Sequence, residues 1–254
     1  MKKQGVCIVM KNTESKTGLG FVQGVKDGIP IGLGYLSVSF SFGIAAVSQG
    51  LSALYATLIS MTNLTSAGQV AGLGIIAAGG TLLEMALAQL IINMRYALMS
   101  ISLSQKLDSS FTTGHRLAVS FGITDEIFAV ASGKKGDISR SYMYGLIAVP
   151  FVCWSLGTLL GAAAGEILPE RLKAALGIAI YGMFIAIFIP PARRSAGVLT
   201  VVLFSAAMSC CFKYIPVLSE VSVGFVIIIC ALAASVLGAL VFPVKDSGEK
   251  EESE

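Results

Sequence analysis

The chain has 254 residues, of which 55% are hydrophobic and only 13% are charged, and its mean hydropathy is +0.81. Soluble domains carry about a quarter charged residues and less than half apolar ones, so this composition excludes an ordinary cytosolic enzyme, a disordered chain and a DNA-binding domain. The 18 basic and 15 acidic residues give a net charge of +3, which is too balanced for a nucleic-acid partner.

Apolar stretches follow one another along nearly the whole chain. Residues 1–26 are interpreted as a polar tail, because the apolar run at 5–10 is too short for a signal peptide. The stretches then lie at 29–48, 51–79 (interrupted), 82–104, 117–132, 142–165, 174–190, 196–212 and 217–242. A spanning helix needs roughly 20 apolar residues. The sequence therefore predicts an all-α, polytopic membrane helix bundle of about seven or eight spans.

The predicted bundle is one transmembrane domain at 27–244, followed by a charged tail at 245–254. Its orientation follows from the basic residues, because Lys and Arg are retained on the cytoplasmic side. Basic clusters lie in the N-terminal tail, at 134–140 and at 193–194. Placing all three inside makes both termini cytoplasmic and requires an odd number of crossings within 51–132. The sequence leaves open whether that number is one or three.

Glycines and cysteines show two different patterns. Gly157, Gly161 and Gly165 form overlapping small-xxx-small steps, which allow helix backbones to approach closely in lipid. The cysteines show no metal-ligand spacing, and His115 is the sole histidine, so we expect neither a metal nor another cofactor. The five cysteines are Cys7, Cys153, Cys210, Cys211 and Cys230.

A first group of polar residues interrupts the stretch at 51–79. It comprises Ser60, Thr62, Asn63, Thr65, Ser66 and Gln69. Two half-helices that meet at an unwound polar segment produce this pattern, and such segments line substrate cavities in transporters. An ordinary loop between two short helices explains the pattern equally well. Asn63 and Gln69 are candidate substrate-binding residues on the first interpretation.

A second group of polar residues lies on one face of the helix predicted at 82–104. Residues spaced by three and four share a helix face, and this polar stripe comprises Gln89, Asn93, Tyr96 and Ser100. The same stretch holds Glu84 and Arg95, about 16 Å apart along the axis at 1.5 Å per residue. Each charge must therefore find another partner. A structural ion pair or a snorkelling side chain is the alternative to a substrate-binding role for Arg95.

The third group is Thr124-Asp125-Glu126 in a short apolar stretch. Adjacent carboxylates at membrane depth repel each other, so one of them could carry a proton or hold a substrate ammonium. A helix start is the other interpretation, with Thr124 as N-cap and two acids in the first turn. The two interpretations are compatible.

These three groups, in this order, resemble the AzlC family. The resemblance rests on Ala67-Gly68-Gln69, on Asn93-Met94-Arg95-Tyr96 and on Thr124-Asp125-Glu126, together with Pro30 and Phe42-Gly43 near the start. It covers about residues 20–240. The family often has His where this chain has Tyr96, so a titrating imidazole is missing at that position.

The resemblance implies the large subunit of a two-component branched-chain amino-acid exporter in a bacterial inner membrane. Its partner would be a small hydrophobic AzlD-like subunit, and its substrates leucine, isoleucine, valine and methionine or analogues. From the chemistry of a zwitterion, we expect substrate binding by Asn63, Gln69, Asn93, Arg95 and Tyr96. Proton coupling or ammonium binding is expected at Glu84, Asp125 and Glu126.

Two other functions fit the same sequence. The chain could export another small solute, or it could be a membrane assembly or sensory subunit without transport of its own. An enzyme is not expected, because HExxH, GxSxG and GxxxxGK[ST] motifs are missing from the sequence.

Overall fold

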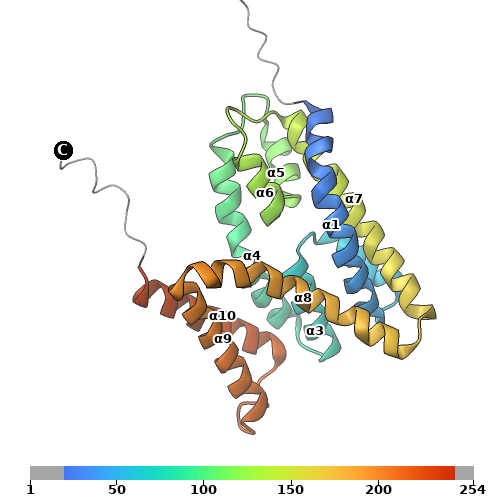
Figure 1. Cartoon of the computed structure of the whole chain (residues 1–254), viewed down its shortest axis with the longest axis vertical. Helices are drawn as coiled ribbons and strands as arrows, with labels where there is room; N and C mark the ends of the chain where they lie inside the picture. The colour runs from blue at the N-terminus through green and yellow to red at the C-terminus, as the bar shows by residue number, and fades with distance from the viewer. Residues whose placement is uncertain (1–19, 244–254) are drawn as a thin grey trace, which may run out of the picture.

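The computed structural model describes residues 20–243, which form ten α-helices and no β-strand (Figure 1). The helices are α1 (Phe21–Ser48), α2 (Ala53–Thr62), α3 (Ser66–Ala77), α4 (Leu82–Ser104), α5 (Thr113–Phe121), α6 (Asp125–Ser132), α7 (Arg140–Ile167), α8 (Glu170–Arg194), α9 (Ala196–Tyr214) and α10 (Val223–Val241). Each of the eight predicted apolar stretches corresponds to one long helix or to a pair of short ones. The predicted all-α membrane bundle is confirmed, but the described residues hold five candidate spans and not the seven or eight predicted, because two of the apolar stretches are broken into short helices.

Five helices are long and apolar enough to cross a membrane, namely α1, α4, α7, α9 and α10. A sixth long helix, α8, has 25 residues and crosses the other helices obliquely in Figure 1. The stretches at 51–79 and 117–132 are both broken, into α2 with α3 and into α5 with α6. The predicted half-spanning helices within 51–132 are therefore present.

The first helix begins earlier than the sequence indicated. Residues 21–26, which we assigned to the polar tail, form the first turns of α1. Polar residues are tolerated at this end because they find partners within the protein: Asp27 pairs with Lys134 at 2.7 Å and accepts a hydrogen bond from Tyr142 at 2.7 Å. Most of the predicted N-terminal tail, with Cys7, and the C-terminal tail lie outside the described residues.

The closest packing in the molecule joins α1 to α7. A Cβ atom added at Gly161 would lie 1.9 Å from the carbonyl oxygen of Phe40, and one at Gly145 would lie 2.2 Å from that of Phe21. Such distances leave no room for any side chain but hydrogen, so the glycines of both helices permit backbone contact. The Gly157–Gly161–Gly165 ladder thus performs the role that its spacing predicted.

The two helices run in the same direction, since residues near the start of α1 contact the start of α7 and residues near its end contact the end of α7. Figure 1 shows them side by side along their whole length. The chain between two parallel spans must return across the membrane an odd number of times. The one long helix that the structure describes in that interval is α4, and a single crossing by α4 satisfies this condition.

The two pairs of short helices break at polar residues. At the first break, Asn63 and Thr65 have extended backbone angles, and the Thr65 side chain does not cap α3 but donates to Asn63 Oδ1 at 2.7 Å. At the second break, the Thr124 hydroxyl accepts a hydrogen bond from the backbone N–H of Ile127. Thr124 is therefore the N-cap that the sequence predicted, with Asp125 and Glu126 in the first turn of α6.

We expect Gly161→Ala to destabilise the protein, because its methyl group would overlap the Phe40 carbonyl. Overpacking of this kind costs about 1–3 kcal/mol, which lowers the melting temperature of the purified protein in detergent. Gly182→Ala is the matched control, since a Cβ at that helical position meets no heavy atom within 4 Å. Equal melting temperatures for the two variants would contradict the contact between α1 and α7.

Candidate functional site

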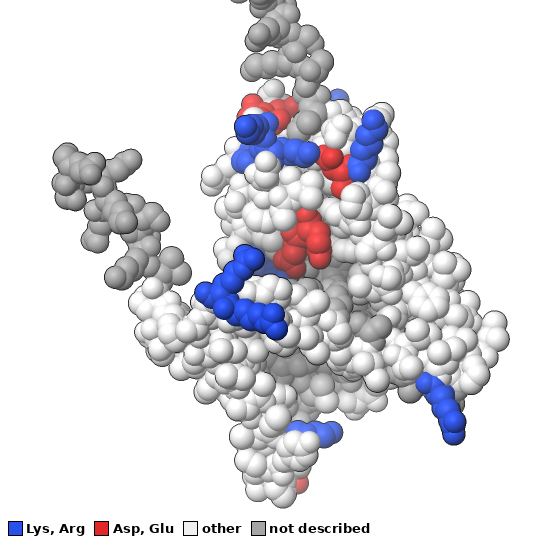
Figure 2. Space-filling model, viewed as in Figure 1, with Lys and Arg blue, Asp and Glu red and all other residues white. Residues whose placement is uncertain are grey.

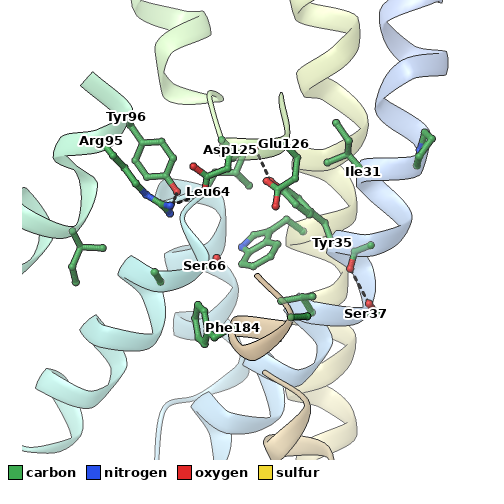
Figure 3. A pocket seen from close by; sticks show the side chains of 18 residues that line it. Ile31, Tyr35, Ser37, Leu64, Ser66, Arg95, Tyr96, Asp125, Glu126 and Phe184 are labelled. Atoms are coloured by element: carbon green, nitrogen blue, oxygen red, sulfur yellow. Dashed lines mark hydrogen bonds and ion pairs between the residues drawn. The ribbon is translucent and has the colours of Figure 1, made fainter. Parts of the chain in front are cut away.

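A cavity of about 570 Å³ lies where the two helix breaks approach each other (Figure 3). Helices α1, α4, α7 and α8 complete its walls. The lining residues that carry its chemistry are Tyr35, Ser66, Arg95, Tyr96, Thr124, Asp125, Glu126, Trp154 and Phe184. Residues from all three polar groups of the sequence therefore line this cavity, together with residues of α1 and α7.

An ion pair lies across the cavity between α4 and α6. Arg95 Nη1 and Asp125 Oδ2 are 2.8 Å apart, and both side chains are just under half exposed. Arg95 also donates to the Tyr96 hydroxyl at 3.2 Å. The pair is thus accessible from the cavity and is not sealed within the bundle. Figure 2 shows acidic side chains facing a hollow of the molecular surface at this level.

The second carboxylate, Glu126, is held by a tyrosine from α1. The Tyr35 hydroxyl hydrogen-bonds with the Glu126 carboxylate and with the Thr124 hydroxyl, the latter at 2.6 Å. Figure 3 shows Glu126 and Tyr35 pointing toward each other. Because Asp125 faces Arg95 and Glu126 faces Tyr35, the two adjacent carboxylates have different partners.

Aromatic rings form the apolar side of the cavity. The rings of Tyr35 and Trp154 meet edge to face, with centroids 5.2 Å apart, and Phe184 of α8 lines the same space. The Trp154 indole N–H donates to Gln69 Oε1 at 3.1 Å. The tryptophan thus presents its ring to the cavity while its polar atom is satisfied behind the wall.

Two of the predicted binding residues, Gln69 and Asn63, support the first break from behind. Gln69 is only 2% exposed, and its amide donates to the carbonyl oxygens of Ile59 and Asn63. Neither residue lines the cavity. Their hydrogen bonds satisfy backbone groups where the helix is interrupted, which is necessary at membrane depth.

The side chains of the polar stripe on α4 have two different roles: some bond to α3, and one lines the cavity. Gln89 donates to the carbonyl of Gly68 at 2.8 Å, and Asn93 donates to Gln89 Oε1 at 3.0 Å, so these side chains join α4 to α3. Asn93 is not a lining residue, whereas Tyr96 on the next turn is. Gly68 permits this contact, because a Cβ there would lie 2.7 Å from Gln89 Oε1.

Glu84 lies apart from the cavity and forms hydrogen bonds at the N-termini of two helices, α4 and α10. Its carboxylate accepts hydrogen bonds from the Ser222 hydroxyl and from the Gly224 N–H, both at 2.7 Å, at the start of α10. It also forms a capping box with Thr81 at the start of α4. A carboxylate is well placed at two helix N-termini, and this contact fixes α10 against α4.

The structure therefore brings together four of the eight predicted site residues: Arg95, Tyr96, Asp125 and Glu126. Sequence reasoning missed Tyr35 and Phe184 and treated Trp154 as packing. Tyr35 lies in an apolar stretch with no polar neighbour to mark it, and its position opposite Glu126 depends on how α1 packs against α6. The residues described contain no group of three or more His, Cys, Asp or Glu side chains that could hold a metal ion.

Comparison with known proteins decides the family. A family model described as AzlC protein matches residues 30–168. The chain belongs to the AzlC family. The match begins within α1, at residue 30, and ends at the end of α7, so it includes the later part of the α1–α7 contact and both helix breaks. It also includes Tyr35, Arg95, Asp125, Glu126 and Trp154. Helix α8, which contributes Phe184, lies outside it.

Three relatives of this AzlC-family chain illustrate the similarity. The inner membrane protein YgaZ of Escherichia coli (strain K12) is 29% identical over 181 residues, which are 68% of this chain and 74% of that protein. An uncharacterized membrane protein of Archaeoglobus fulgidus is 31% identical over 172 residues, 67% and 75% of the two chains. One of Helicobacter pylori (strain 26695) is 27% identical over 154 residues, 58% and 66% of the two chains.

No solved structure matches the chain. Family membership and the helices together establish a membrane protein of transporter type, from a family that is not one of enzymes.

We expect Gln69→Leu to change the fluorescence of Trp154, which is the sole tryptophan of the chain. The indole N–H loses its buried partner, and the carbonyls of the first break lose theirs. An unsatisfied buried polar group costs about 1–3 kcal/mol, so both the emission maximum and the melting temperature should shift. Gln49→Leu, at the exposed end of α1, is the control. An unchanged spectrum would refute the contact.

Proposed function

We propose that the chain is the transport subunit of an exporter that carries branched-chain amino acids, and that the cavity between the two breaks binds them. The observation that carries this proposal is the juxtaposition of an accessible Arg95–Asp125 ion pair, a second carboxylate and an aromatic wall in one cavity. A zwitterion with an apolar side chain requires those three partners and no others.

The substrate carboxylate has two partners on one side of the cavity. Arg95 offers a guanidinium that matches carboxylate geometry. Ser66 and Ala67, which line the cavity, belong to the first turn of α3, where no side chain caps the helix. Free N–H groups at a helix start favour an anion. The first break therefore supplements the guanidinium.

The substrate ammonium finds its partner at the second break. Asp125 already pairs with Arg95, so a zwitterion that enters between them gives each charge a new partner of the opposite sign. Glu126, held by Tyr35, stands beside this position and can receive a proton. We therefore assign proton coupling to Asp125 and Glu126, while Glu84, at its helix junction, is the weaker candidate.

The apolar side chain of the substrate packs against Trp154 and Phe184. An apolar wall discriminates one methylene by only about 1–3 kcal/mol. Leucine, isoleucine, valine and methionine should therefore compete with one another.

The proposed complex includes a small AzlD-like membrane subunit. Among the described residues of α9 none is buried, so this chain alone leaves that helix open. The basic end of the molecule, with Lys26, Lys106 and Lys134, faces the cytoplasm in this proposal, as do both termini. The relative named as an inner membrane protein supports a bacterial inner membrane as the location.

Export of preloaded radiolabelled leucine tests the site. We expect cells that produce the chain and its small partner to lose leucine, isoleucine and valine faster than unrelated amino acids. Arg95→Ala should reduce this efflux more than about tenfold, because loss of one member of a charge pair costs about 2–5 kcal/mol. Arg171→Ala, at the opposite end of the molecule, should leave efflux unchanged.

Two outcomes separate the alternatives. Selective efflux of a different solute that Arg95→Ala abolishes would keep the site and change the substrate. Absence of any efflux, with both subunits inserted in the membrane, would favour an assembly or sensory subunit.

The coupling proposal makes a separate prediction. If a proton moves through the second break, then Glu126→Gln should remove the pH dependence of efflux in membrane vesicles while leucine binding persists. Asp125→Asn should also remove the pH dependence of any remaining efflux, but it should weaken leucine binding as well, because it removes the partner of the substrate ammonium. Trp154 fluorescence reports that binding, because the indole lines the cavity. Glu166→Gln, at the end of α7, is the matched control. Unchanged pH dependence in both variants would exclude these carboxylates as the coupling groups.

A further inference from the structure

A second cavity, of about 280 Å³, lies between the end of α4 and the short helix α5. Its floor is apolar and includes Leu103 and Val119, both of which are buried in the protein core. Its polar lining residues include Ser100 and Arg116. Ser100 belongs to the polar stripe of α4, and the first cavity does not use it.

Arg116 is exposed, and no carboxylate within residues 20–243 forms an ion pair with it. The ion pairs found there join other residues, and the Arg116 side chain donates no hydrogen bond within residues 20–243. A guanidinium at the edge of an apolar cavity favours an anionic partner, and its planar donors match a phosphate oxygen pair.

Two of the apolar side chains that line the cavity are exposed at the molecular surface. Ile101 and Leu117 stand on its two sides and are 62% and 69% exposed. Apolar side chains exposed to this degree on membrane helices contact acyl chains. Other basic residues, Lys106 and Lys134, lie at this end of the molecule, where Figure 2 shows basic side chains together with acidic ones.

We propose that this cavity binds a phospholipid with an anionic headgroup. The headgroup phosphate lies against Arg116 and the hydroxyl of Ser100, and an acyl chain follows Ile101 and Leu117 toward the membrane interior. The Arg116 guanidinium favours an anionic headgroup, and the apolar floor of the cavity favours a ligand that carries an acyl chain.

The position of this lipid connects it to the site of the first cavity. Ile123 lines the second cavity, and the next residue, Thr124, lines the first. A lipid that fills the space between α4 and α5 therefore supports the second break, which holds Asp125 and Glu126. Lipid binding itself does not depend on the proposed function, although its effect on transport does.

Native mass spectrometry of the full chain tests the proposal. The protein is extracted from vesicles that contain equal amounts of phosphatidylglycerol and phosphatidylcholine, and the lipids that remain bound are counted. We expect one phosphatidylglycerol to be retained in preference to phosphatidylcholine. Arg116→Gln should weaken this retention about fivefold to tenfold, whereas Arg171→Gln, the same charge change at the opposite end, should not.

A cavity-filling variant keeps the test independent of charge. Ser104→Phe should displace the lipid while Arg116 is intact, and a melting curve of each variant shows that it is folded. Equal retention of the two lipids, or equal loss in Arg116→Gln and Arg171→Gln, would overturn the proposal. Displacement of the lipid by millimolar inorganic phosphate would also overturn it, because the headgroup alone would then account for binding.

Discussion

The backbone contact between α1 and α7 is the constraint on which the rest of the structure depends. Glycines on both helices allow carbonyl oxygens to lie where side chains would otherwise be, along almost the full length of two parallel spans. Because packing is the main force between helices in lipid, so long a contact holds α1 and α7 together as one rigid unit. Tyr35 and Trp154, which form one wall of the cavity, project from these two helices and are fixed by their register.

Both helix breaks need hydrogen-bond partners for their unwound backbone. Unwound backbone is costly at membrane depth unless protein groups satisfy it. At the first break the buried Gln69 does so, with its amide nitrogen on backbone carbonyls and its oxygen on the Trp154 indole. At the second break Thr124 caps α6 and receives Tyr35. The polar residues that the sequence marked as candidates for substrate binding are thus divided between supporting the breaks and facing the cavity.

This division explains which parts the sequence predicted. Apolar length located the eight hydrophobic segments, and polar interruptions located both breaks, because the cost of polar groups in lipid is a local property. The roles of Gln69, Asn93 and Glu84 were not predictable, since each depends on a partner distant in sequence, such as Trp154, Gly68 or Gly224. Tyr35 was missed for the same reason: only the packing of α1 against α6 gives it a carboxylate.

Charge balance connects this architecture to the proposed transport. Arg95 and Asp125 neutralise each other, so neither charge faces an apolar wall without a partner. A zwitterion that inserts between them replaces one ion pair by two and leaves the net charge of the site unchanged. A solute with a single charge would leave either Arg95 or Asp125 unpaired, and an unpaired charge in such surroundings is costly. In the proposed function, paired charges would therefore select the ammonium and carboxylate groups of an amino acid, and the aromatic wall would have only to distinguish side chains.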